Sequence, residues 1–144
     1  MIEMALAVQL RDAGLNWEPV KGDAFALTTA DMATETFVLS DMVVDLHRVA
    51  GSQVIGFNGT VEWALDSVEI DRAVWLPWEH QLRAALGPVL LALRQTPSVD
   101  PAAAWTVDLS LPDGPAVVTA PTAEEAYAVA LLHLLHTGWG AALA

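Results

Sequence analysis

The strictest alternation of apolar and polar residues in the chain runs over Trp105–Leu111, where every second residue is apolar. A strand directs successive side chains to opposite faces of a sheet, so this period of two predicts a strand with one buried face. The turn-forming residues Pro112-Asp113-Gly114 follow directly. They predict a hairpin onto a second strand over residues 116–119.

The pattern changes to a helical one after Thr122. Thr122 and Glu125 have the spacing of a capping box, in which the threonine hydroxyl meets an N–H of the first turn and the glutamate reaches back. We expect a helix over Ala123–His136 that ends at Gly138. A similar one-sided apolar stripe predicts a first helix over residues 2–13, which ends at Gly14.

Between these helices the pattern favours strands. After a loop over residues 17–23, residues 24–28 read as a strand, residues 30–35 as a polar connection, and residues 36–49 as one long strand bent near Ser40-Asp41. Residues 50–52 then turn the chain into a strand over residues 53–57. Together the segment from residue 24 to residue 65 predicts an antiparallel meander.

The block over residues 57–83 contains three of the six tryptophans, a hairpin signal and the clearest helix start. Asn58-Gly59 is typical of a type I′ turn, so a hairpin is expected there. Residues 60–68 fit two patterns, because their apolar residues alternate as in a strand and also form a helical stripe. Both interpretations of residues 60–68 stay open, and the turn favours the strand.

A further helix is expected to begin at Leu76 or Pro77, because proline is well tolerated in the first helical position. Its apolar face would continue to Leu93. Gly87-Pro88 interrupts this face, which predicts a kink or two short helices meeting there. Residues 95–101 are the best linker candidate, although their length also suits an ordinary loop.

Two motifs of this block, FNGTVEWALDSV at residues 57–68 and WLPWEHQLR at residues 75–83, resemble a group of short uncharacterised bacterial proteins, mostly actinobacterial. The triplet Trp78-Glu79-His80 departs from the more charged triplet of that group. Some of its members are labelled as pilus-assembly proteins, but nothing in this chain resembles a nucleotide-binding assembly ATPase. The resemblance implies a shared small fold and supplies no catalytic residue.

The length of 144 residues suits a single domain over residues 1–144. We expect an α+β fold of about five to seven antiparallel strands, in one or two sheets covered by three or four helices. The chain is 54% hydrophobic, but its apolar runs are shorter than the roughly 20 residues that span a bilayer. The N-terminus lacks a basic region before an apolar core, so a cytoplasmic protein without membrane contact is expected.

The charge pattern argues against several kinds of function. Eighteen acidic and six basic residues give a net charge of −12, which repels phosphate backbones, so we expect no binding to nucleic acid. The absence of cysteine excludes disulfides and thiolate metal ligands. Nucleotide-binding loops and nucleophile elbows are also missing from the sequence, so no cofactor is expected.

The sequence contains only weak evidence for a metal site. His133 and His136 lie three residues apart near the end of a helix, but no third ligand stands at a recognisable spacing. A carboxylate run fits no EF-hand loop and is interpreted as solvated turn residues; it comprises Glu62, Asp66, Glu69 and Asp71. No metal site is expected.

Two functional hypotheses remain. Trp75 and Trp78 bracket a helix start beside His80, and these three residues are the tentative partner-binding site, although packing inside the domain is the competing interpretation of both rings. The leading hypothesis is a non-enzymatic interaction or scaffold module that forms a homo-oligomer or binds a protein partner. The alternative is a small enzyme with an acid–base cluster formed by Asp41, Asp45 and His47, or by His80.

Overall fold

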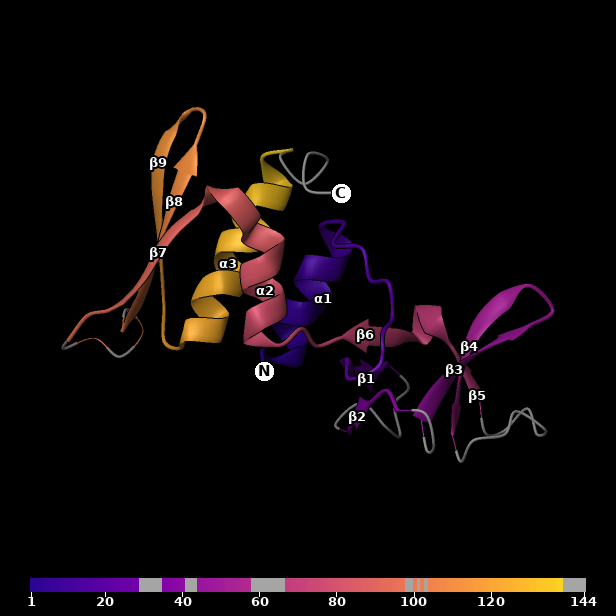
Figure 1. Ribbon diagram of the computed structural model, residues 1–144. Helices are drawn as coiled ribbons and strands as arrows, with labels where there is room; N and C mark the ends of the chain where they lie inside the picture. Colours follow the sequence, from indigo (N-terminus) through magenta and orange to yellow (C-terminus); the bar gives the residue numbers. More distant parts are fainter. Residues whose placement is uncertain are drawn as a thin grey trace. The chain divides into compact units, whose positions relative to one another are not determined.

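The computed structural model describes residues 1–28, 35–40, 44–57, 67–97, 100, 102 and 104–138. The chain divides into two compact units, of which one comprises Met1–Leu15 and Trp78–Ala144 and the other Asn16–Pro77. The described residues form three α-helices and nine strands, and the strands make three antiparallel sheets of three strands each (Figure 1). The predicted α+β class is confirmed, with more strands than expected. The predicted single domain over residues 1–144 stays a prediction.

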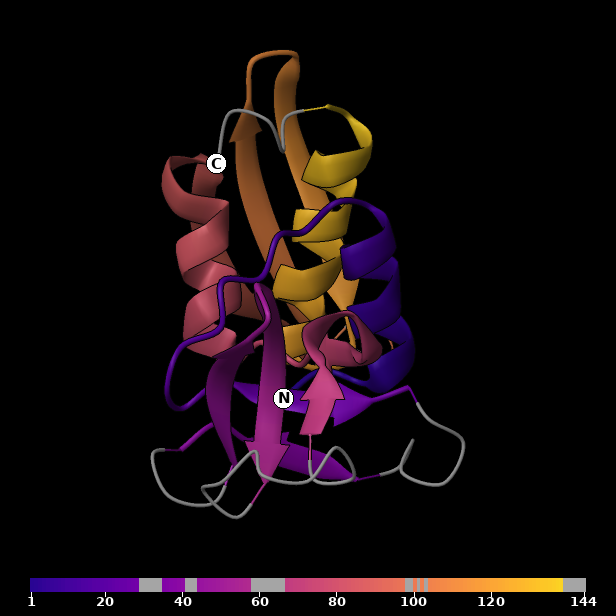
Figure 2. The same ribbon diagram turned by 90° about the vertical axis from the view of Figure 1, so that its right-hand side faces the viewer.

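The first unit combines three helices with one sheet. Its elements in chain order are α1 (Met4–Asp12), α2 (Glu79–Leu86), the 3-10 turn η2 (Gly87–Val89), β7 (Leu90–Gln95), β8 (Trp105–Leu111), β9 (Gly114–Ala120) and α3 (Ala123–His136). Helix α3 packs on β8 and β9, and α1 and α2 both pack against α3. Figure 2 shows the three helices side by side, with α3 in the middle. The buried residues of α3 include Ala126, Ala130 and Leu134, whose small and branched side chains allow this close packing.

Strand β8 is the centre of this sheet, with β7 and β9 at its two edges. Val107 and Leu109 are fully buried, as the predicted alternation requires. The hairpin from β8 to β9 pairs residues continuously from Leu111↔Gly114 to Trp105↔Ala120. The β7–β8 ladder contains a register shift between Leu90 and Ala92.

The second unit contains two small sheets. One has the order β2-β1-β6, from β1 (Ala24–Leu27), β2 (Thr36–Val38) and β6 (Ala73–Trp75), and the other has the order β3-β4-β5, from β3 (Val44–Val49), β4 (Ser52–Phe57) and β5 (Ser67–Glu69). A 3-10 turn, η1 (Ile70–Arg72), connects β5 to β6. The two sheets share one core, which is made of Phe25, Leu27, Leu39, Ile55 and Ala73.

The single long strand expected over residues 36–49 is wrong. Strand β2 ends at Val38 and belongs to one sheet, whereas β3 begins at Val44 and belongs to the other. The Leu39 N–H donates to the Asp23 carbonyl and its own carbonyl accepts from the Gly22 N–H, so Leu39 continues the pairing of β2 with the segment before β1. Leu39 is thereby buried in the core, and the β-branched residues on both sides of it serve different sheets.

The helix expected from Leu76 or Pro77 to Leu93 is also corrected. The Leu76 N–H still donates to the Ala24 carbonyl, which holds the chain in its extended course, and α2 begins only at Glu79. At its other end Gly87 adopts φ 52° and ψ −131°, and after η2 the chain continues as β7. The apolar residues at 90 and 93 therefore belong to a strand instead of a second helix.

Other expectations are confirmed. Helix α1 lies within residues 2–13 and is followed by Gly14 at φ 99°, and α3 has the predicted bounds. The linker candidate over residues 95–101 begins in β7 and leads to the adjacent strand β8, so it is a connection within one sheet. The single meander expected from residue 24 to residue 65 is wrong, because β1 and β2 belong to one sheet and β3 and β4 to another. The Asn58-Gly59 turn and residues 60–66 lie outside the described residues, while Ser67 and Val68 belong to β5.

Candidate interaction edge and polar hollow

The outer edge of β9 has a backbone geometry set by its turn. Leu111 and Gly114 flank a two-residue turn, so this pair exchanges both of its backbone hydrogen bonds. Hydrogen-bonded and non-hydrogen-bonded pairs alternate along an antiparallel ladder. Pro115, Val117 and Thr119 therefore direct their backbone groups away from β8. Within the part of the chain that the structure describes, β9 pairs with β8 alone.

The two edges of this sheet differ in their protection. Strand β7 contains the register shift and carries Arg94, and bulges and charges are features that discourage pairing with another strand. Strand β9 has an unbroken register and contains no charged residue. Pro115 does not weaken the β8–β9 ladder, because a proline is tolerated where the backbone N–H would point away from the partner strand. The edge is open at Val117, whose side chain is 62% exposed.

The guanidinium of Arg94 is already engaged on this sheet. Its Nε and Nη2 atoms donate to the two carboxylate oxygens of Asp108 on the neighbouring strand, both over 2.7 Å. These hydrogen bonds, and then the charge of Asp108, raise the pKa of Arg94 above its usual value. The pair therefore joins β7 to β8. Strand β9 itself contains no charged residue.

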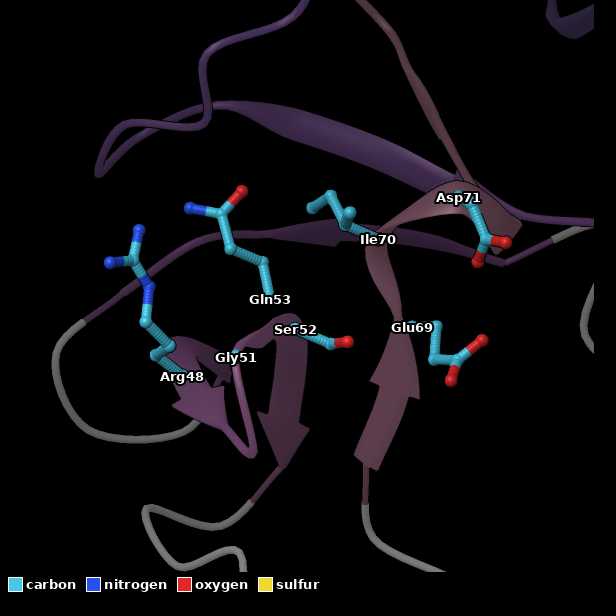
Figure 3. Close-up of a pocket in the computed structure, with 7 residues that line it drawn as sticks. All are labelled: Arg48, Gly51, Ser52, Gln53, Glu69, Ile70 and Asp71. Carbon is cyan, nitrogen blue, oxygen red and sulfur yellow. The ribbon is translucent and has the colours of Figure 1, made fainter.

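The second unit contains a polar hollow of about 440 Å³. Seven residues line it, namely Arg48, Gly51, Ser52, Gln53, Glu69, Ile70 and Asp71 (Figure 3). One wall of the hollow lies at the end of β5, where the strand ends at Glu69 and the chain continues into η1. The other wall is the tight turn between β3 and β4, where Ala50 and Gly51 have φ values of 50° and 91°.

The polar side chains around this hollow are not bonded to one another. Arg48, Glu69 and Asp71 are exposed, and Gln53 is half-buried. None of these four side chains has a hydrogen bond or ion pair with another described residue. The strand register places Arg48 and Gln53 on one face of the sheet, and Glu69, which pairs with Val54, on the other. Figure 3 accordingly shows the carboxylates of Glu69 and Asp71 pointing away from Arg48 and Gln53.

The three residues predicted to bind a partner have distinct environments. In the second unit, the ring of Trp75 stacks on Trp17 with 6.4 Å between centroids and 3° between planes, and its Nε1 is buried without a hydrogen-bond partner among the described residues. In the first unit, Trp78 is half-buried and precedes α2, and its backbone N–H donates to Oε1 of Gln81 over 2.9 Å. His80 is exposed in the first turn of α2. A partner site at these residues stays a prediction.

The acid–base cluster is only partly within the described residues. Asp41 and the side chain of Asp45 lie outside them. His47 is half-buried in β3, opposite Val54, and its Nε2 is buried without a partner among the described residues. The enzyme hypothesis built on these residues stays a prediction.

The candidate metal ligands do not come together as a group of three within the described residues. His133 and His136 are both exposed near the end of α3. No group of three or more potential ligands occurs among the described residues, which do not include Glu62 and Asp66. In that same portion of the chain, no helix is long and apolar enough to cross a bilayer.

Comparison of the chain with protein-family models, curated proteins and solved structures found no match. The two sites therefore rest on their own geometry. Sequence reasoning considered Glu69 and Asp71 only as solvated turn residues and did not identify Arg48 or Gln53, because no motif connects them. The edge position of β9 was also missed, since it depends on the order of strands in the sheet.

Proposed function

We propose that the protein is a non-enzymatic interaction module that forms a homo-oligomer by pairing β9 of one copy with β9 of another. The observation that carries this proposal is the open, uncharged edge of β9, with Val117 62% exposed at its centre. Natural proteins generally protect such an edge or use it for pairing. The pairing would extend the three-stranded sheet across the interface.

The edge is compatible with a two-fold axis. In an antiparallel pair centred on Val117, the two Val117 residues exchange both backbone hydrogen bonds. Thr119 of each copy then meets Pro115 of the other. The Thr119 N–H donates to the Pro115 carbonyl, and only the missing proline N–H leaves an acceptor unpaired. The two exposed Val117 side chains would lie on the same face of the joined sheet and contact each other.

Charge opposes this association at long range. Each copy has a net charge of −12, so two copies repel each other at low ionic strength. Raising the salt concentration shortens the Debye length from about 30 Å at 0.01 M to about 10 Å at 0.1 M. The proposed oligomer should therefore dissociate less as salt is added, in contrast to a complex held by ion pairs.

The test compares two matched substitutions by sedimentation equilibrium. Val117 and Leu91 are each 62% exposed, on the two opposite edges of the same sheet. Val117→Lys should weaken self-association at least tenfold, because it places a like charge on both strands at the two-fold axis. Leu91→Lys makes the same change in net charge at the other edge and should leave self-association unchanged.

A second variant isolates the backbone. Val117→Pro removes an N–H that points away from β8, so the hairpin keeps its own ladder while the intermolecular bond is lost. This variant should be folded by circular dichroism and monomeric. A wild-type protein that remains monomeric up to millimolar concentration would refute the proposal. Equal losses of self-association in Val117→Lys and Leu91→Lys would refute it as well.

The proposed module acts in the cytoplasm and does not bind nucleic acid, in keeping with its acidic composition. A protein partner that adds its own strand to β9 is the second candidate. A monomeric wild-type chain that binds another protein would indicate this second candidate, provided that Val117→Pro abolishes the binding.

A further inference from the structure

We propose that the polar hollow of the second unit binds a monocarboxylate with a short apolar chain, held by Arg48, Gln53 and Ile70. The hollow measures about 440 Å³, within the range of about 300–1,000 Å³ that is common for small-ligand sites. The β9 edge lies in the other unit, so this inference does not depend on the proposed self-association.

Arg48 and Gln53 form a cross-strand pair on the core-facing side of their sheet. They stand opposite each other in β3 and β4, two positions along from the pair Leu46↔Ile55. Side chains alternate between the two faces of a sheet, so both pairs lie on the same face. Ile55 belongs to the core, and Leu46 packs against it. The guanidinium and the amide therefore continue an apolar surface with polar groups.

The carboxylate end of the ligand fits this pair. Arg48 is exposed and has no hydrogen bond or ion pair with another described residue. A guanidinium presents its donors in a planar fork that matches a carboxylate, and the amide NH2 of Gln53 adds a further donor. Figure 3 shows both side chains extending to the same side of the sheet. Glu69 and Asp71 point away from the pair, so they do not occupy the guanidinium.

Ile70 offers the apolar contact. It is half-buried, packs against the core and points toward Gln53 in Figure 3. A ligand whose carboxylate lies at the guanidinium can place a short alkyl chain against Ile70, and removal of both apolar surfaces from water is favourable. An amine of the same shape is excluded from this position because Arg48 repels it.

The experiment is an NMR titration of the 15N-labelled protein with 4-methylpentanoate. It is carried out in 0.15 M salt, where a Debye length of about 8 Å screens the distant charges of a protein with net charge −12. Two probes are compared with it: 4-methylpentanamide, which has the same shape without the charge, and acetate, which lacks the chain.

We expect 4-methylpentanoate to bind with a dissociation constant on the order of 1 mM, as a small ligand does in an open site. Its chemical-shift changes should centre on Arg48, Gln53 and Ile70. Both comparison probes should bind at least tenfold more weakly, because each of them lacks one of the two contacts.

Four variants test the contacts. Arg48→Gln removes the charge that holds the carboxylate and should weaken binding at least tenfold. Gln53→Glu should have a similar effect, because its new carboxylate occupies the guanidinium. Glu69→Gln lies on the opposite face and should change the dissociation constant less than twofold. Arg11→Gln is the matched basic control, since it removes an exposed guanidinium that pairs with Asp12 in the other unit. The amide spectrum reports whether each variant is folded.

Several results would overturn the proposal. Equal binding of 4-methylpentanoate and 4-methylpentanamide would show that the carboxylate is not recognised. Equal binding of acetate would show that the apolar contact is not used. A loss in Arg11→Gln as large as in Arg48→Gln, or shift changes confined to residues outside the hollow, would place the contact elsewhere. A tenfold gain in Glu69→Gln would contradict the position of that carboxylate on the opposite face. Absence of any shift change up to about 50 mM ligand would exclude a site of this class.

Discussion

The indole Nε1 of Trp17 donates a hydrogen bond to Oδ2 of Asp23 over 2.8 Å, and the backbone N–H of Val20 donates to the same oxygen over 3.0 Å. Asp23 is only 1% exposed and begins the approach to β1. The ring of Trp17 then stacks on Trp75 and contacts Phe25, with ring centroids 6.1 Å apart in the second pair. One carboxylate thus fixes the loop before β1 and the aromatic ring that covers the core of the second unit.

Asp23→Ala should therefore destabilise the protein by about 3 kcal/mol or more, because it leaves two donors without their charged acceptor. Asp23→Asn retains an acceptor oxygen in nearly the same place and should cost less. Chemical denaturation monitored by tryptophan fluorescence measures both effects. Asp12→Ala serves as the control, since that carboxylate is exposed. A loss in Asp23→Ala no larger than in Asp12→Ala would contradict the assigned role.

The cap of α3 gives a second prediction. The hydroxyl oxygen of Thr122 accepts a hydrogen bond from the Glu125 backbone N–H over 3.2 Å. Thr122→Ala should lower the free energy of unfolding by about 0.5–2 kcal/mol, whereas Thr122→Ser should retain most of it. Urea denaturation of the three proteins measures the difference. An alanine variant as stable as the serine variant would show that the hydroxyl makes no stabilising contact.

Gly87 gives a third prediction. Its backbone, at φ 52° and ψ −131°, connects α2 to η2, and a Cβ added there would meet no atom within 4 Å. The cost of Gly87→Ala is therefore conformational and should be about 1–3 kcal/mol. Thermal unfolding followed by circular dichroism would detect it. The matched control is Ala85→Gly inside α2, which should cost about 1 kcal/mol through helix propensity alone. Unchanged stability of Gly87→Ala would mean that this backbone conformation is not needed.

The environment of Tyr127 leads to the prediction that the protein loses stability in alkaline solution. Burial, and then the nearby charge of Glu79, raise the pKa of its phenol above 10, while Arg83 acts in the opposite direction. The folded protein thus holds the phenolic proton more tightly than the unfolded chain does. The corresponding stability is complete below pH 10 and is lost as the pH rises through the folded-state value.

The chain contains one tyrosine, so tyrosinate absorbance reports this group alone. We expect its titration midpoint to lie above that of the urea-unfolded protein. Glu79→Gln should move the midpoint downward, and Tyr127→Phe should remove this contribution to the alkaline loss of stability. A midpoint equal to that of the unfolded chain would refute the prediction.

Local patterns in the sequence were sufficient for α1, α3 and the β8–β9 hairpin. Each has a signal that acts within a few residues, such as the hydroxyl of Thr122, the positive φ of Gly14 and Gly138, or the two-residue turn after Leu111. Hydrogen bonds of this kind form between near neighbours, so they can be predicted without knowledge of the rest of the chain.

The tertiary structure alone decided where strands belong. The β-branched residues around Leu39 suit a strand on either side of it, but β2 before Leu39 pairs with β1, whereas β3 after it pairs with β4. Likewise, the apolar residues after Gly87 fit a helix by spacing, and they form β7 because β8 supplies the partner strand. Strand pairing joins residues distant in sequence, and its pattern is visible only when both partners are placed.

Both candidate sites depend on the same long-range order. The composition GPAVVTA of β9 is ordinary for any strand, and it becomes an open edge only because β8 has β7 on its other side. Arg48 and Glu69 are 21 positions apart and share no motif, yet the order β3-β4-β5 brings both to one hollow. The sequence by itself determined the local elements and the acidic charge, whereas strand order, which is set by pairing across the chain, determined which surfaces are available for binding.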